Sequence, residues 1–352
     1  MNPITYHLFF STLGLGTMIT FISSHWLLAW VGLEINTLAI IPLMARHHHP
    51  RASEAATKYF LTQAYASAIL LFATVLNWSS MEQWDIMHMT DPLSVTLVTV
   101  ALAMKLGLVP LHFWLPEVMQ GIDLTTGLIL ATWQKLAPFA LLLQINHNIP
   151  PFTLILLGLI SAWVASWAGL DQTQMRKILA YSSISHLGWM VVIMQFAPAM
   201  ALFSLMIYIL MTTAAFLTLK EASSTKISIL SISWSKNSFM VAMLAMVLLS
   251  SAGLPPFTGF APKIYMLEEL TKQGMSVPAT LLAASTLISL YYYLRLYYFS
   301  TISLFPGTSK SKIRWHRNKK QNKTLLAAVA IAAISFLPLA PFIYVMTQLL
   351  LN

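Results

Sequence analysis

The stretch KLGLVPLHFWLPEVMQG (residues 105–121) sets a lysine, a histidine, a glutamate and two prolines among otherwise apolar residues. In water these residues would need no explanation, but an ionisable group inside a lipid bilayer is costly. A proline inside a helix also removes a backbone hydrogen bond and breaks or kinks that helix. The fold therefore depends on whether this stretch lies within a membrane.

The composition of the whole chain places it there. Hydrophobic residues make up 57% of the sequence and charged residues only 9%, which leaves too little polar surface for a water-soluble domain. Apolar runs long enough for a helical span recur along the chain, and they do not alternate with the period of two that a β-barrel requires. We therefore expect an all-α polytopic membrane protein, with residues 1–352 forming a single membrane domain. The eleven predicted spans lie near residues 3–22, 26–44, 56–76, 92–116, 124–144, 150–169, 175–195, 199–219, 239–270, 277–299 and 324–349.

Several function classes are excluded by what the sequence lacks. There is no cysteine, so disulfides, thiolate-held metal and iron–sulfur clusters cannot form within this chain. Neither a phosphate-binding P-loop nor the glycine pattern of a dinucleotide-binding fold is present. The N-terminal MNPITYHLFF lacks the charged region and cleavage site of a signal peptide, so we expect the first span to remain.

Basic residues gather on alternate loops. They include Arg46, Arg51 and Lys58, the pair at 176–177, Lys220, Lys226 and Lys236, and the run at 310–323. By the positive-inside rule the N-terminus lies on the cytoplasmic or matrix side and the C-terminus lies opposite. This topology accounts for the net charge of +9 without a nucleic-acid partner.

Two features of these loops have alternative interpretations. The basic run KSKIRWHRNKK (310–320) is interpreted first as an orientation signal, with lipid or subunit docking as the second possibility. The adjacent His47, His48 and His49 could bind a metal, but histidines in a basic loop are more often solvated.

Four charges remain within the predicted spans: Glu34, Lys105, Lys135 and Lys263. Arg295 lies near a span end and can extend its charge to the interface. Each charge at bilayer depth costs at least ~2.5 kcal/mol. A structural ion pair would explain Glu34 and one lysine, but not the other two lysines. Because burial disfavours the charged form of lysine and a nearby carboxylate favours it, such a set suits proton transfer.

Two histidines within spans, His112 and His186, are candidate auxiliary proton carriers. A plain helix-packing hydrogen bond is an equally open interpretation of each. A haem-binding interpretation is weaker, because the two histidines show no paired-ligand arrangement.

Glycine and proline predict breaks within two of the spans. Gly107 with Pro110 interrupts the fourth span, and Gly253 with Pro255 and Pro256 interrupts the ninth. Each break begins with Gly-Leu, and proline follows within two residues. Backbone groups freed at membrane depth are tolerated only where they line protein or a water-filled cavity. A kink without any role in conduction is the alternative for either break taken alone.

The two breaks are five spans apart, which predicts an inverted repeat with broken helices along an ion path. In this plan the first five-helix repeat covers residues 1–144 and the second covers 150–299. A basic matrix loop at 300–323 and a C-terminal helix at 324–352 complete the chain.

At this point a resemblance becomes specific. The motifs that carry it are WVGLEINTLAIIPLM (30–44), KLGLVPLHFWLPEVMQG (105–121), TWQKLAP (132–138), RKILAYSSISHLGWM (176–190) and GLPPFTGFAPK (253–263). They resemble the antiporter-like membrane subunits of mitochondrial respiratory complex I, the NADH:ubiquinone oxidoreductase. The resemblance covers essentially the whole chain, in the shortened animal form that lacks additional N-terminal helices of bacterial relatives.

The resemblance implies a role for each buried charge. Glu34 would pair with Lys105, while Lys135 and Lys263 would continue a charged axis along the membrane midplane. The chain would be a proton-translocating subunit of an NADH:ubiquinone reductase in the mitochondrial inner membrane, with its N-terminus in the matrix and its C-terminus in the intermembrane space.

The same resemblance implies partners. No redox centre is expected in this chain, and NADH, FMN, iron–sulfur clusters and ubiquinone would be bound by partner subunits that supply the energy. Other membrane and accessory subunits are the expected protein partners, and phospholipids, including cardiolipin, are expected at the basic loops. Two alternatives stay open: a stand-alone cation/proton antiporter, and a non-conducting structural subunit.

Overall fold

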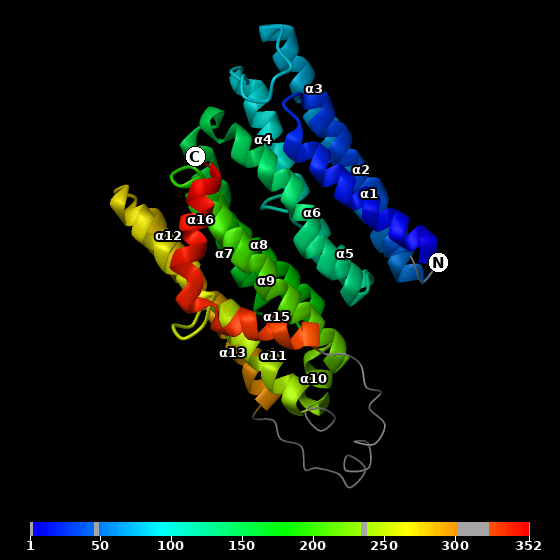
Figure 1. The fold of residues 1–352 in the computed structure, drawn as a ribbon, viewed down its shortest axis with the longest axis vertical. Helices are drawn as coiled ribbons and strands as arrows, with labels where there is room; N and C mark the ends of the chain where they lie inside the picture. The colour runs from blue at the N-terminus through cyan, green and yellow to red at the C-terminus, as the bar shows by residue number, and fades with distance from the viewer. Residues whose placement is uncertain (1–2, 46–48, 234–237, 302–323, 352) are drawn as a thin grey trace. The chain divides into compact units, whose positions relative to one another are not determined.

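The computed structural model describes residues 3–45, 49–233, 238–301 and 324–351. Regular structure in these segments is helical and divides into two compact units, Met1–Ser161 and Ala162–Asn352 (Figure 1). The boundary between the units falls inside one helix, Pro151–Gly169, whereas the sequence placed the boundary of its repeats just before that helix. The two predicted repeats remain a prediction.

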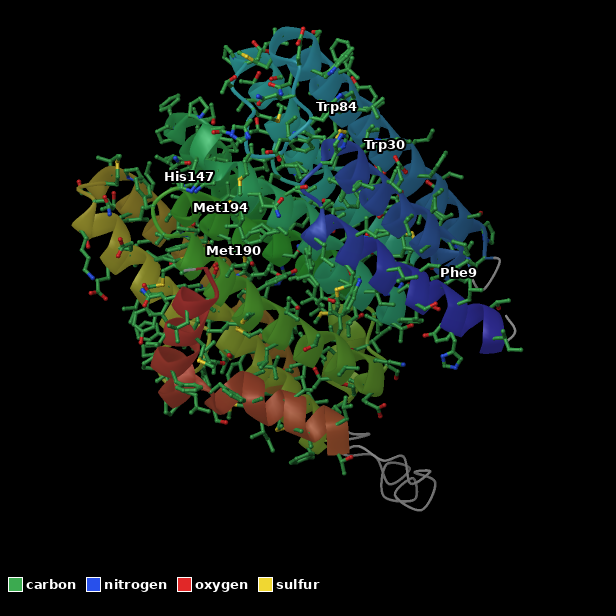
Figure 2. All side chains as sticks on the ribbon, turned by 45° about the horizontal axis from the view of Figure 1, so that its top comes forward. Phe9, Trp30, Trp84, His147, Met190 and Met194 are labelled. Carbon is green, nitrogen blue, oxygen red and sulfur yellow. The ribbon has the colours of Figure 1, made fainter. Side chains whose placement is uncertain are left out.

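The first unit is built from long helices with two short ones. Its elements are α1 (Pro3–Ile22), α2 (Trp26–Met44), α3 (Pro50–Met81), α4 (Pro92–Leu106), α5 (Trp114–Gly121), α6 (Leu124–Ile145), the 3-10 helix η1 (Asn146–Asn148) and the first part of α7 (Pro151–Gly169). Helix α1 packs along α2, α3 contacts α2, α4 and α5, and α6 contacts α1, α2 and α4 (Figure 1). Trp30 lies on α2 (Figure 2). Its indole joins α2 to α3 by donating to the carbonyl of Ser67 at 3.1 Å.

The second unit is arranged around α9. Its elements are the remainder of α7, α8 (Met175–Met194), α9 (Pro198–Ala222), α10 (Ile227–Ser233), α11 (Ser238–Ala252), α12 (Phe260–Lys272), α13 (Ser276–Thr301), α15 (Thr324–Ser335), the 3-10 helix η3 (Leu337–Leu339) and α16 (Ala340–Leu351). Helix α9 contacts α8, α11, α12, α15 and α16, while α13 contacts α10, α11 and α12 (Figure 1).

Eight helices in the described residues are long and apolar enough to cross a membrane, and a ninth span results if α15 and α16 are taken together. Those two helices meet at an angle of 66°, a bend that the sequence did not predict. Pro338 lies at the bend, where its missing N–H prevents a continuous helix. The eleven predicted spans also count the two interrupted segments, α4 with α5 and α11 with α12, so their number stays a prediction.

Other boundaries differ from the predicted ones for local reasons. Helix α3 is longer than the predicted span 56–76, because Pro50 occupies its first position and the ring of His49 caps it by accepting from the N–H of Arg51. It ends at Met81, and the following Glu82 caps it with a left-handed φ. The short α10 was not predicted, since it is too brief for a periodic apolar pattern.

Both interrupted segments stop at a left-handed glycine. Gly107 (φ +80°) directly follows the last residue of α4, and Gly253 (φ +83°) directly follows the last residue of α11. In each case the following leucine N–H bonds back to the carbonyl five residues earlier, and the glycine N–H bonds to the carbonyl three residues earlier. This is the Schellman arrangement, which satisfies carbonyls that a helix end leaves free.

Two glycines let the backbones of α1 and α2 approach closely. A Cβ on Gly16 would lie 2.9 Å from the carbonyl oxygen of Gly32, and a Cβ on Gly32 would lie 2.9 Å from that of Gly16. Because membrane helices associate through close backbone packing at small residues, this contact explains how α1 is held against α2.

Candidate functional site

Lys105 lies in the last turn of α4, directly before the break at Gly107. Its side chain is buried, and its Nζ has no hydrogen-bond partner among the described residues. The C-terminal end of a helix carries partial negative charge, so this position favours a cation. A buried ammonium without a partner is nevertheless costly, which marks Lys105 as a candidate functional residue.

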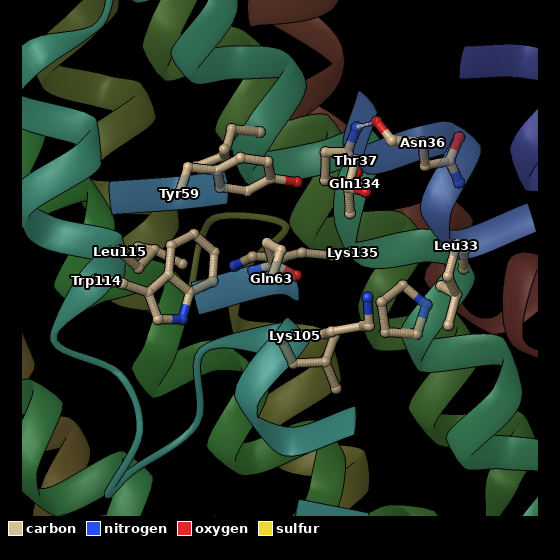
Figure 3. A pocket seen from close by; sticks show the side chains of 14 residues that line it. Leu33, Asn36, Thr37, Tyr59, Gln63, Lys105, Trp114, Leu115, Gln134 and Lys135 are labelled. Carbon is tan, nitrogen blue, oxygen red and sulfur yellow. Dashed lines mark hydrogen bonds between the residues drawn. The ribbon is translucent and has the colours of Figure 1, made fainter. Parts of the chain in front are cut away.

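Lys135 lines the same cavity as Lys105. It projects from α6 and is 2% exposed. The cavity measures about 20 Å³, which is room for about one water molecule, and both lysines are among its lining residues (Figure 3). The rest of the lining is partly apolar and partly neutral and polar. The neutral polar side chains are those of Asn36, Thr37, Tyr59, Gln63 and Gln134. Two basic groups therefore share one small, partly polar space.

Neither a hydrogen bond nor an ion pair joins Glu34 to Lys105 or Lys135 within the described segments. Its carboxylate accepts a hydrogen bond from the hydroxyl of Thr37 at 2.9 Å, and the side chain is half-buried. No ion pair joins Glu34 to Lys105 in the part of the chain that the structure describes. The carboxylate is close enough to act electrostatically on Lys105 and on the buried hydroxyl of Tyr59. The pairing that the sequence suggested remains a prediction.

The second unit has a comparable cavity around Lys263. This lysine lies in the first turn of α12, and its Nζ donates a hydrogen bond of 2.7 Å to the carbonyl oxygen of Ala252. The cavity measures about 20 Å³ and is also lined by His186 of α8 and Tyr208 of α9. The rings of His186 and Tyr208 are 5.8 Å apart. His186 and Lys263, which the sequence predicted separately as candidate proton carriers, thus line one cavity.

His112 lies in the backbone break between α4 and α5. It is 3% exposed, and its ring is 4.3 Å from that of Phe113. It is not among the residues that line the cavity of Lys105 and Lys135. The structure therefore brings the two lysines together but places His112 elsewhere in the first unit.

The neutral polar residues of the first cavity were not predicted from the sequence. Gln63 and Gln134 carry no charge, so a search for ionisable residues within the spans does not identify them. Lys58 was assigned to topology alone. The Lys58 ammonium bridges the carboxylates of Glu54 and Glu117, each at 2.8 Å, and so ties α3 to α5. All three side chains are largely exposed, so the bridge contributes little to stability by itself.

The described segments contain no group of three or more histidines and carboxylates that could hold a metal ion. His47 and His48 of the predicted histidine cluster lie outside the described residues. His49 is described, and it serves as the N-cap of α3.

Comparison with known proteins gives matches along nearly the whole chain. Residues 23–289 match the family "NADH:quinone oxidoreductase/Mrp antiporter, TM", and residues 290–344 match "NADH dehydrogenase subunit 2 C-terminus". The NADH-ubiquinone oxidoreductase chain 2 of Carassius auratus is 55% identical over 347 residues, covering 99% of this chain and 100% of the relative. The protein of the same name from Salmo salar is 56% identical over 341 residues, covering 97% and 98%.

A solved structure gives the same indication for the fold. A chain of respiratory complex I from Thermus thermophilus, determined with bound aureothin, superposes with a TM-score of 0.85. It is 28% identical, and the match covers 98% of this chain and 80% of that chain. The antiporter-like helical fold predicted from the sequence is confirmed.

Proposed function

Because this chain belongs to the NADH:quinone oxidoreductase/Mrp antiporter family, and within it to the group of NADH-ubiquinone oxidoreductase chain 2, we propose that it is a proton-translocating membrane subunit of a respiratory NADH:ubiquinone oxidoreductase. Protons are carried by Glu34 with Lys105 and by Lys135 in the first unit, and by Lys263 in the second. His112 and His186 serve as auxiliary carriers.

The observation that carries this proposal is the shared cavity of Lys105 and Lys135. A lysine exchanges a proton by moving between its ammonium and neutral amine forms, and burial brings these forms closer in free energy. Two ammonium groups in one desolvated space repel each other, so protonating one lysine favours proton release from the other. A water in the cavity, held by the neutral polar lining, provides the path between them.

The energy comes from partner subunits. Moving one charge against the membrane potential takes ~2.3 kcal/mol per 100 mV, and this chain offers no nucleotide or redox chemistry of its own. NADH, FMN, the iron–sulfur clusters and ubiquinone bind to those partners, whose redox reaction drives the proton steps. The enzyme lies in the mitochondrial inner membrane, with the N-terminus in the matrix and the C-terminus in the intermembrane space. Phospholipids, cardiolipin among them, contact the basic loops.

The proposal is tested in assembled enzyme enclosed in sealed vesicles. Lys105→Met removes the proton-carrying group and keeps a similar side-chain length, while Lys226→Met at an exposed lysine is the matched control. We expect unchanged assembly for both, with NADH-driven quinone reduction and proton pumping reduced only in Lys105→Met. Wild-type rates in both variants would contradict a relay role for Lys105.

A separate measurement distinguishes the stand-alone antiporter. The purified chain is placed in liposomes with opposed sodium and proton gradients, and internal pH is followed. We expect no exchange above that of empty liposomes, because the driving reaction lies in partner subunits. Sodium/proton exchange that Lys105→Met abolishes would favour an independent antiporter over the proposed function.

A further inference from the structure

Lys263 occupies an electrostatically unfavourable position in its own helix. It is the fourth residue of α12, within the first turn. The N-terminal end of a helix carries partial positive charge, so a cation there is disfavoured. The side chain must therefore find its stabilisation in another element.

That element is the end of α11. Ala252 is the last residue of α11, and the last four carbonyls of a helix lack partners within the helix. The Nζ of Lys263 donates to the carbonyl oxygen of Ala252 at 2.7 Å. The Lys263 ammonium thus lies at the negative end of α11, just as Lys105 lies in the last turn of α4. In each unit, a lysine charge is placed at the end of the first half of an interrupted helix.

Gly253 leaves the space that this contact needs. A Cβ on Gly253 would lie 2.8 Å from Nζ of Lys263, 2.9 Å from its Cδ and 3.0 Å from its Cε. The corresponding Gly107 has nearly the same φ, but there a Cβ would meet Cδ1 of Leu115 at 3.0 Å. The left-handed backbone favours glycine at both positions. Only at Gly253 would a larger residue also clash with a lysine side chain.

We propose that the carbonyl of Ala252 is the docking site of the Lys263 ammonium and that Gly253 is the positioning residue that permits docking. A role of Lys263 in proton transfer rests on the proposed function. The docking itself rests only on the contact with Ala252 and on the space at Gly253. In the docked form the ammonium lines the cavity of His186 and Tyr208. When Nζ passes its proton to a neutral acceptor in this cavity, one N–H bond breaks, the acceptor gains the proton, and a neutral amine remains. That amine binds the carbonyl less strongly than the ammonium does.

The docking is tested by thermal unfolding of the assembled complex in a double-mutant cycle. Gly253→Ala is combined with Lys263→Ala, and Gly107→Ala with Lys263→Ala is the matched control. We expect Gly253→Ala to lower the melting temperature less when Lys263→Ala has removed the obstructing side chain. The decrease from Gly107→Ala should be the same in both backgrounds.

Equal decreases from Gly253→Ala in both backgrounds would overturn the docking. If the left-handed backbone at Gly253 makes Gly253→Ala prevent assembly in both backgrounds, Gly253→Asn replaces it in the same cycle, because asparagine tolerates this backbone and also adds a Cβ. Quinone-reduction turnover of Lys263→Ala is measured in parallel. Coupled melting temperatures with wild-type turnover would leave the docking standing and contradict the relay role of Lys263, so the two failures are distinguishable.

Discussion

Lys105 of α4 and Lys135 of α6 line one buried cavity, although they come from different helices and carry like charges when both are protonated. No carboxylate is among the residues that line this cavity with them. Repulsion between the two ammonium groups makes the doubly protonated state unfavourable. The proposed relay therefore predicts that a proton arriving at one lysine changes the free energy of the proton on the other.

Glu34 and Lys105 are expected to be energetically coupled although no ion pair joins them in the part of the chain that is described. We expect Glu34→Gln and Lys105→Met each to slow proton-coupled quinone reduction, and the double variant to be little worse than the slower single one. The coupling in activation free energy should exceed ~0.5 kcal/mol. Thr37→Val, which removes the hydrogen bond to Glu34 but no charge, should have a smaller effect than Glu34→Gln. Turnover losses that simply multiply would remove the pair from the mechanism.

The orientation of the chain is tested with introduced cysteines, since the chain has none of its own. Ser311→Cys marks the basic loop and Asn352→Cys marks the C-terminus, and both positions lie outside the described residues. In sealed inner-membrane vesicles we expect a membrane-impermeant thiol reagent to label them from opposite faces. Labelling of both from the same face would contradict the predicted count of eleven spans.

The contact between α1 and α2 is tested by comparing two glycines of one helix. Gly16→Ala would place a methyl group 2.9 Å from the carbonyl of Gly32, whereas Gly14→Ala meets nothing within 4 Å. We expect Gly16→Ala to reduce the thermal stability of the assembled subunit, since close packing must open. Gly14→Ala should leave it unchanged or slightly raise it, because alanine favours the helix. Equal melting temperatures for the two variants would contradict the packing.

Much of the helical fold could be predicted from the sequence, because apolar runs of membrane length leave few alternatives. The ends of α1 and α2 agree with the predicted spans 3–22 and 26–44. The bend between α15 and α16 was missed, since Pro338 stands in an apolar run that a hydropathy pattern cannot distinguish from a straight span. Prolines at 42 and 138 occur within continuous helices, so proline alone does not specify a break.

The candidate site was predictable only in part. Lys105, Lys135 and Lys263 could be predicted because an ionisable residue within an apolar span is costly and therefore indicates a function. Their partners depend on tertiary packing that the sequence does not encode locally. The carbonyl of Ala252 belongs to the backbone, and its contact with Lys263 requires the particular turn at Gly253. The Lys58 bridge to Glu117 likewise joins residues far apart along the chain.

The most direct measurement of the central claim is the turnover and proton pumping of assembled enzyme carrying Lys135→Met or Lys135→Arg. Lys135 is the better of the two cavity lysines for this purpose, because it lies well inside α6 and away from any helix break. Lys220→Met, at an exposed lysine, is the control. A purely structural lysine would be replaced by methionine at little cost, since the penalty of burying its charge disappears and its volume is nearly kept.

If Lys135 carries protons, both variants assemble, yet NADH-driven quinone reduction and proton pumping fall at least tenfold, which corresponds to about 1.4 kcal/mol in the activation barrier. Arginine does not rescue, because a guanidinium cannot release its proton. Wild-type turnover with wild-type proton pumping in either variant would contradict the assignment of Lys135 to the relay.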